Sequence, residues 1–124
     1  MQQAAYIFGG LFGFMAIVLG AFGSHLLKKK WSKEILDSFE IGVKYQMYHA
    51  LFLLLVGIIL PFDSNTEKLA VIFAIIGVFL FSGSIYGICI LKSKDKSAKA
   101  LGPITPLGGL SLLLSWLVFL LALI

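Results

Sequence analysis

Uncharged stretches of membrane-spanning length dominate the pattern of hydrophobic and polar positions. Four stretches lack any Asp, Glu, Lys or Arg, at residues 2–27, 45–62, 69–91 and 100–124. Polar residues do not recur in them at the spacing of a water-facing helix surface. Because about 20 helical residues cross a bilayer core of about 30 Å, the pattern predicts an all-α integral membrane bundle of four transmembrane helices. We expect these helices in one domain, 1–124, at about 4–27, 33–60, 67–91 and 106–124.

Local signals predict where two of these helices begin and end. Ser32 is a suitable N-cap for the second helix, and apolar residues repeat every four positions over 35–43. This helix should therefore have an amphipathic extension at the headgroup level before its membrane span. Pro61 is expected to end it. In the fourth helix, Thr105 is the expected N-cap and Pro106 the expected first helical residue.

Small residues follow one face of the first, third and fourth expected helices. Such positions let helix backbones approach closely in lipid, where apolar burial alone does not drive association. They predict a tight bundle, closed either within one chain or between chains. The glycines expected to pack helices together are Gly9, Gly13, Gly20, Gly23, Gly77, Gly83, Gly108 and Gly109.

Charge adds an orientation to this picture. Only 13% of residues are charged, about half the share in soluble proteins. Nine of the lysines lie in segments 28–44 and 92–104, and one, Lys68, lies between the second and third helices. The positive-inside rule then makes both lysine-rich segments cytoplasmic and puts both termini outside. The first stretch should be a retained helix, because MQQAAYIFGG lacks the basic residues that open a signal peptide.

The lysines also account for the net charge of +4, so no nucleic-acid partner is expected. Beside an anionic leaflet, each lysine near the surface attracts acidic lipids by about 1 kcal/mol. The lysines expected to contact such lipids include Lys28, Lys29, Lys30, Lys92 and Lys94.

Polar side chains are expected to gather at the cytoplasmic end of the bundle. Depth counted from the nearest lysines places residues of all four helices at similar levels. The expected cluster is His25, Tyr45, Tyr48, His49, Ser82, Ser84, Tyr86 and Thr105. Polar groups in lipid face the bundle interior and find partners there, so we expect His49 to bond a tyrosine hydroxyl or Ser84. The alternative is a small pocket, or a proton or ion relay in which His49 titrates.

The sequence offers little catalytic or metal-binding chemistry. It contains no phosphate-binding glycine loop, GxSxG or HExxH motif. His25, His49 and Cys89 have suitable ligand types for zinc, but they lack the close spacing of zinc sites. We therefore expect no metal and no cofactor.

Four short motifs occur in order along the chain: GAFGSHLL, YQMYHALFLL, FSGSIYGI and ITPLGGL. Together they resemble the small bacterial inner-membrane proteins classed as domain of unknown function 423, which are similar to eukaryotic transmembrane protein 256. The resemblance covers nearly the whole chain and implies a multi-pass protein of the bacterial cytoplasmic membrane. It implies no mechanism. The positions it marks are Gly20, Gly23, His25, Tyr45, His49, Ser82, Gly83, Ser84, Tyr86, Thr105, Pro106, Gly108 and Gly109.

Three functions are compatible with these features. The first is a non-enzymatic protein that stabilises the membrane or a larger assembly through helix and lipid contacts, which the absence of catalytic motifs favours. The second is a homo-oligomeric transporter or channel subunit that uses the polar cluster. The third is an enzyme acting on a lipid headgroup or quinone, with His25 and His49 as acid and base, which requires both imidazoles near one ligand.

Overall fold

The computed structural model describes residues 1–124 apart from the side chain of Ser24, and it contains four long helical segments, as predicted. The elements are α1 (Gln2–Ile17), the π-helical segment η1 (Val18–Gly23), α2 (Ser24–Leu27), α3 (Lys33–Ile59), α4 (Asn65–Ser93) and α5 (Ile104–Leu123). α1, η1 and α2 run on as one segment, Gln2–Leu27. All four segments are long and apolar enough to cross a membrane, which supports the predicted membrane bundle.

The start of α3 agrees with its predicted cap. The Ser32 side chain accepts a hydrogen bond from the backbone N–H of Ile35 at 3.3 Å. From Lys33 the helix continues through the amphipathic extension to Ile59 without a break. Segment 33–44 is therefore part of the α3 helix, and the connection between α2 and α3 is only residues 28–32.

The starts of α4 and α5 differ from the sequence-based expectations. α4 begins with a capping box, in which Ser64 and Glu67 each bond the backbone N–H of the other at 3.3 Å. The S-x-x-E pattern is typical of such a helix start, and it places the start two residues before the expected 67. The expected capping role of Thr105 is wrong, because α5 begins at Ile104 with Pro103 before it. The Thr105 hydroxyl instead reaches across to α4.

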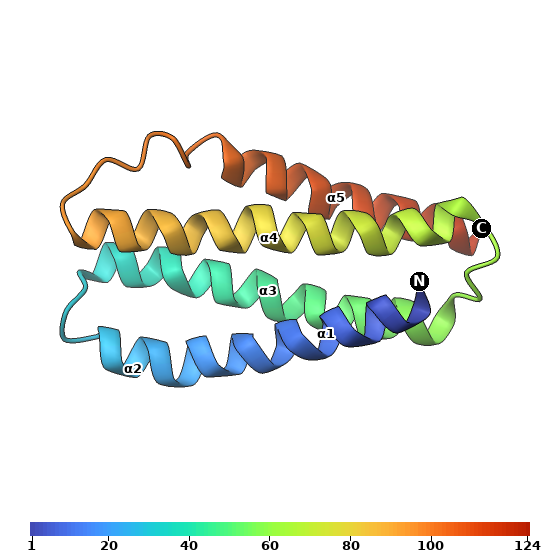
Figure 1. Ribbon diagram of the computed structural model, residues 1–124, viewed down its shortest axis with the longest axis horizontal. Helices are drawn as coiled ribbons and strands as arrows, with labels where there is room; N and C mark the ends of the chain where they lie inside the picture. Colours follow the sequence, from blue (N-terminus) through green and yellow to red (C-terminus); the bar gives the residue numbers. More distant parts are fainter.

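The helices are arranged with α3 and α4 in the middle. α1 packs along α3, and α5 packs along α4 on the other side (Figure 1). Both chain termini and the α3–α4 turn lie at one end of the bundle, whereas the α2–α3 and α4–α5 connections lie at the other. The two lysine-rich segments consequently share one end.

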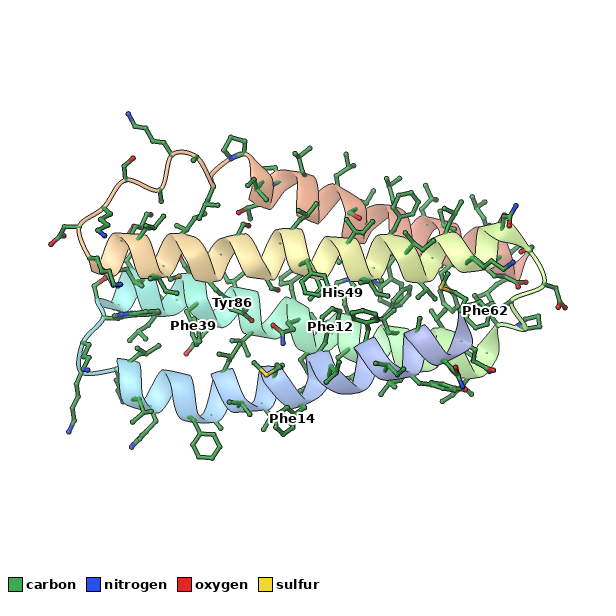
Figure 2. The ribbon with its side chains drawn as sticks, viewed as in Figure 1. Phe12, Phe14, Phe39, His49, Phe62 and Tyr86 are labelled. Carbon is green, nitrogen blue, oxygen red and sulfur yellow. The ribbon has the colours of Figure 1, made fainter. Side chains whose placement is uncertain are left out.

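Aromatic side chains fill much of the main core. Phe12 is 7% exposed and points between the helices, whereas Phe14 is 65% exposed and points away from the bundle (Figure 2). The ring of Phe52 on α3 lies 4.4 Å from Trp116 and 5.4 Å from Phe119, both on α5. These rings join α3 to α5 although their backbones are not in close contact.

Glycines bring the backbones of α4 and α5 into contact. A Cβ added at Gly108 would collide with the Phe81 backbone nitrogen of α4. One added at Gly77 would lie 2.9 Å from the Leu112 nitrogen of α5. These close approaches are of the kind that small residues permit between membrane helices.

The other glycines expected to pack helices differ among themselves. A Cβ at Gly9 would meet the Ala50 carbonyl oxygen at 3.0 Å, and at Gly20 or Gly23 it would meet a side chain at 3.2 Å. Gly13 and Gly109 have room for a Cβ at ordinary contact distance. Gly83 has no atom within 4 Å of an added Cβ, so it lies at an open surface of α4.

Candidate functional site

The buried face of α3 carries polar side chains as well as apolar ones. Its buried positions lie three and four residues apart, and include Phe39, Gly42, Gln46, His49, Leu53 and Val56. This spacing keeps them on one side of the helix. Gln46 and His49 therefore point into the bundle, where a polar group needs a partner.

Gln46 joins three helices. Its side-chain Nε2 donates to the Phe12 carbonyl oxygen of α1 at 2.9 Å, and its Oε1 accepts from the Tyr86 hydroxyl of α4 at 2.7 Å. Figure 2 shows Phe12 and Tyr86 between the helices. Gln46 thus ties α1, α3 and α4 together at one level.

A second link between α3 and α4 lies beside the first. The Ser82 hydroxyl donates to the Gly42 carbonyl oxygen at 2.6 Å. A Cβ at Gly42 would lie 2.8 Å from the Tyr86 ring. Gly42 therefore makes room for Tyr86 to reach Gln46.

His49 connects α3 to α5 and is 4% exposed. Its Nδ1 lies 2.7 Å from the Tyr45 carbonyl oxygen, and its Nε2 accepts from the Trp116 indole N–H at 3.2 Å. Because Nε2 accepts, the ring proton belongs on Nδ1, where it bonds the carbonyl. His49 is thus a neutral imidazole with both nitrogens occupied, and its partners are not the tyrosine hydroxyl or Ser84 expected from the sequence.

Ser84 and Thr105 link α4 to α5. Their hydroxyl oxygens are 2.6 Å apart, and the Ser84 hydroxyl also lies 3.0 Å from the Phe81 carbonyl oxygen of its own helix. If Ser84 donates to that carbonyl, Thr105 donates to Ser84. The pair then satisfies both hydroxyls where the fourth membrane segment begins.

The expected cluster does not form one group, because the lysines used to count depth lie at different levels. Cys89 contacts the Ile35 carbonyl oxygen at 3.5 Å, and Ser82 bonds that of Gly42. α4 runs antiparallel to α3, so Lys44 lies beside the turn of α4 that contains Ser82. Ser82 is ten residues, or about 15 Å, from Lys92 along α4. His49 is therefore about two turns deeper in the membrane than Ser84 and Tyr86.

Three other residues of the expected cluster lie outside the bundle core. Tyr45 and Tyr48 are 41% and 51% exposed, because each lies one residue away from the buried stripe of α3. Their rings lie 5.8 Å apart, and the Tyr45 ring packs on Phe81 at 4.9 Å. His25 is exposed and lines a hollow at the corner of α2 and α3.

His25 and His49 do not meet at a common ligand. Gly23 faces Phe39, so His25 lies near the level of Asp37, twelve residues or about 18 Å before His49 along α3. The third function, an enzyme with His25 and His49 as acid and base, requires both imidazoles near one ligand, and this separation does not allow that.

Internal hydrogen bonding accounts for the polar groups buried in this bundle. In residues 1–23 and 25–124, every buried side-chain nitrogen or oxygen has a partner. The same residues contain no group of three His, Cys, Asp or Glu side chains placed to hold a metal. The arrangement is suited to joining helices, since each link removes the cost of an unpaired polar group in lipid.

A lateral hollow opens beside the Gln46 link. It has a volume of about 240 Å³, lies between α1 and α4, and is lined by Phe12, Gln46, Gly83 and Tyr86 among others. Its walls are mainly apolar. The open surface at Gly83 is part of it.

Two important residues, Gln46 and Trp116, are not among the candidate site residues, although the sequence does place Gln46 at the same end of the bundle as Tyr45 and Tyr48. Gln46 could have been found from its spacing, since it lies four residues after Gly42 and three before His49 on one face. Trp116 is twelve residues into α5, and His49 is sixteen residues into α3. Counting from the helix starts would have placed them at nearby depths.

Comparison with known proteins agrees with the architecture. The family model described as "Protein of unknown function (DUF423)" matches residues 19–109. A UPF0382 membrane protein of Staphylococcus epidermidis is 37% identical over 116 residues, which cover 94% of this chain and 91% of that protein. The UPF0382 membrane protein YwdK of Bacillus subtilis is 37% identical over 94% of this chain and 92% of its own.

The similarity extends to a eukaryote. A UPF0382 membrane protein of Schizosaccharomyces pombe is 36% identical over 107 residues, covering 86% of this chain and 89% of that protein. No solved structure matches this chain.

Proposed function

The chain belongs to the family of proteins of unknown function DUF423, and from that premise we propose that it is a non-enzymatic membrane protein acting through helix and lipid contacts. In this role it stabilises the membrane or a larger assembly. The pairing of its buried polar side chains supports the proposal. Gln46 and His49 are the interior groups best suited to binding or proton transfer, and both are engaged with neighbouring helices.

Solute flux tests this proposal. The wild-type chain and His49→Ala are reconstituted into liposomes, and proton and ion fluxes are followed with trapped dyes. Both proteins should leave the vesicles as tight as protein-free ones, while His49→Ala unfolds more easily because it loses two hydrogen bonds. A flux that disappears in His49→Ala contradicts the proposal. Tyr48→Ala is the matched control, because Tyr48 is on the exposed side of the same helix.

A second candidate function is a homo-oligomeric transporter or channel subunit. The lateral hollow beside Gln46, Tyr86 and Gly83 favours it, because a neighbouring copy at the open face of Gly83 would enclose polar groups. Native mass spectrometry in lipid tests this candidate. A monomer at all concentrations rules it out, whereas an oligomer that Gly83→Leu disrupts supports it.

We further propose that the protein lies in the bacterial cytoplasmic membrane with segments 28–44 and 92–104 in the cytoplasm. The clustering of lysines at one end supports this orientation, and the same lysines, including Lys28 and Lys92, favour anionic lipids there. In a Cys89→Ala background, an impermeant maleimide should label Ser97→Cys only in inverted vesicles and Asp63→Cys only in right-side-out ones. The reverse labelling pattern would contradict this orientation.

A further inference from the structure

Part of the charged face of α3 lies where both neighbouring segments are uncharged. Lys33, Asp37, Glu40 and Lys44 follow one exposed face of this helix at spacings of three and four residues. Neighbouring contacts fix their level. Val43 lies against Gly20, and Gly42 lies against Ser82. The Glu40–Lys44 turn is therefore flanked by uncharged residues of η1 and α4.

Charges beside lipid are costly and usually mark a functional path or ligand. Lys44 is about 16 Å further along the helix than Lys33, so this charged face runs from the cytoplasmic side to the edge of the membrane span. Both carboxylates and Lys44 lie on the exposed surface, so protein atoms do not shield them. Lipid headgroups at the membrane surface are polar groups that can solvate them there.

Two adjoining hollows accompany this charged face. The outer one, of about 490 Å³, lies at the corner of α2 and α3 and is lined by His25, Lys28, Lys33, Asp37 and Glu40 among others. The inner one, of about 300 Å³, lies further along α3 and is lined by Gly20, Glu40, Val43 and Lys44. Since Glu40 borders both, they form one groove between the first membrane segment and α3. Its lining residues run from Lys28 at the lysine-rich end to Lys44 at the edge of the membrane span of α3.

The order of charges along the groove matches one kind of headgroup. From the membrane interior outward come the ammonium of Lys44, then the carboxylates of Glu40 and Asp37, and then the lysines Lys33 and Lys28 at the outer end. A phospholipid with its chains directed inward presents its phosphate first and its amine next. We propose that this groove, named here the α2–α3 groove, binds a zwitterionic phospholipid headgroup with a phosphate and a primary ammonium, as in phosphatidylethanolamine.

Each part of that headgroup has a counterpart in the groove. Lys44 provides three N–H donors for the phosphate, and Glu40 and Asp37 provide acceptors for the primary ammonium. Gly20 and Val43 leave an apolar wall for the start of the acyl chains. Choline has no N–H to donate, and an anionic glycerol headgroup brings no positive charge to the two carboxylates. The groove should therefore prefer ethanolamine to both.

Lipid selection by the whole chain tests the site, which rests on the proposed role in lipid contacts. The protein is reconstituted in vesicles of equal parts phosphatidylethanolamine, phosphatidylcholine and phosphatidylglycerol with identical acyl chains. Native mass spectrometry then compares protein-bound lipid with bulk lipid. The ethanolamine lipid should be enriched about tenfold, as expected for charge-assisted hydrogen bonds. Glu40→Gln and Lys44→Gln should each abolish the enrichment.

Matched controls come from the α4–α5 connection, which lies at the same end of the bundle. Asp95→Asn and Lys94→Gln remove the same charges from an exposed segment outside the groove, and enrichment should persist in both. Equal binding of the three lipids overturns the site. So does an ethanolamine lipid that is not enriched over phosphatidylcholine, or ethanolamine enrichment that Glu40→Gln leaves intact. These results would leave the proposed non-enzymatic function standing, because only a His49-dependent flux contradicts it.

Discussion

Single side chains explain how a polar histidine and glutamine persist inside an apolar bundle. Gln46 uses its amide nitrogen toward α1 and its amide oxygen toward α4, and His49 uses both ring nitrogens. In lipid the alternative to such partners is an unpaired polar group, because no water replaces them. The stabilisation per bond is still modest, about 0.6 to 2 kcal/mol, since an unfolded helix in the membrane finds other partners.

Gln46 and Tyr86 should behave as an energetically coupled pair. Gln46→Leu removes the acceptor of the Tyr86 hydroxyl and is expected to lower the free energy of unfolding by about 1–2 kcal/mol. Tyr86→Phe should cost less, because Gln46 keeps its bond to the Phe12 carbonyl oxygen. Unfolding in bicelles gives these values, and the double variant should lose less than the sum. Strict additivity would show that the 2.7 Å contact contributes nothing.

The indole N–H of Trp116 should contribute through His49. Trp116→Phe keeps an aromatic ring beside Phe52 but removes the donor to Nε2. We expect a loss of about 1 kcal/mol in the free energy of unfolding. In a His49→Leu background, the same substitution should lower the free energy of unfolding clearly less, since no acceptor for the indole N–H remains there. An equal loss in both backgrounds would assign the effect to ring packing alone.

At the scale of helices, the sequence predicts the length of each helix well, but it predicts less well which face of each helix is buried. The number of helices follows from uncharged spans, because lipid requires a fixed apolar length, and the Ser32 cap follows from local hydrogen bonding. Two members of the cluster expected around His49 lie outside the core, because depth along a helix does not set which way a side chain points. Tyr45 and Tyr48 share the depth of Gln46 and His49, but a shift of one residue turns each by 100° toward lipid.

Contacts between helices were also beyond prediction from one sequence. Gly83 and Gly108 both occur in small-residue patterns, yet only Gly108 lies against a backbone. Which small residue meets a neighbour depends on how the helices cross, and spacing within one helix does not set that. Likewise, the sequence does not show how α3 and α4 are staggered, so it does not reveal that Lys44 and Lys92 lie at different depths.

Gly108 should be the most restrictive glycine at the α4–α5 contact. An added Cβ would collide with the Phe81 backbone, which cannot rotate away as a side chain can. Gly108→Ala is therefore expected to destabilise the protein by about 1–3 kcal/mol, or more if α5 separates from α4. Gly109→Ala is the neighbouring control, because its Cβ would lie 3.7 Å from the Phe81 ring, an ordinary contact. Similar unfolding free energies for the two variants would contradict this packing.

For the whole molecule, the arrangement places α1 and α5 on opposite sides of the α3–α4 pair. Their outer faces carry many of the exposed large apolar side chains, such as Leu11 and Leu113, which is suited to lipid. The central pair carries the polar links. A membrane protein of this size thus combines an apolar exterior with an interior held by a few hydrogen bonds, and most of its charges lie at the lysine-rich end.

Distances between spin labels test this arrangement directly. Gly10 on α1, Leu51 on α3 and Leu117 on α5 lie at similar depths, because Gly9 meets Ala50 and His49 meets Trp116. Packed helices have axes 8–10 Å apart, so the label distance from Gly10 to Leu117 should exceed that from Gly10 to Leu51 by at least about 8 Å. Equal distances would indicate a closed square bundle in which α1 and α5 touch. Diluting labelled with unlabelled protein removes contributions between copies, so any distance lost on dilution reports an oligomer instead.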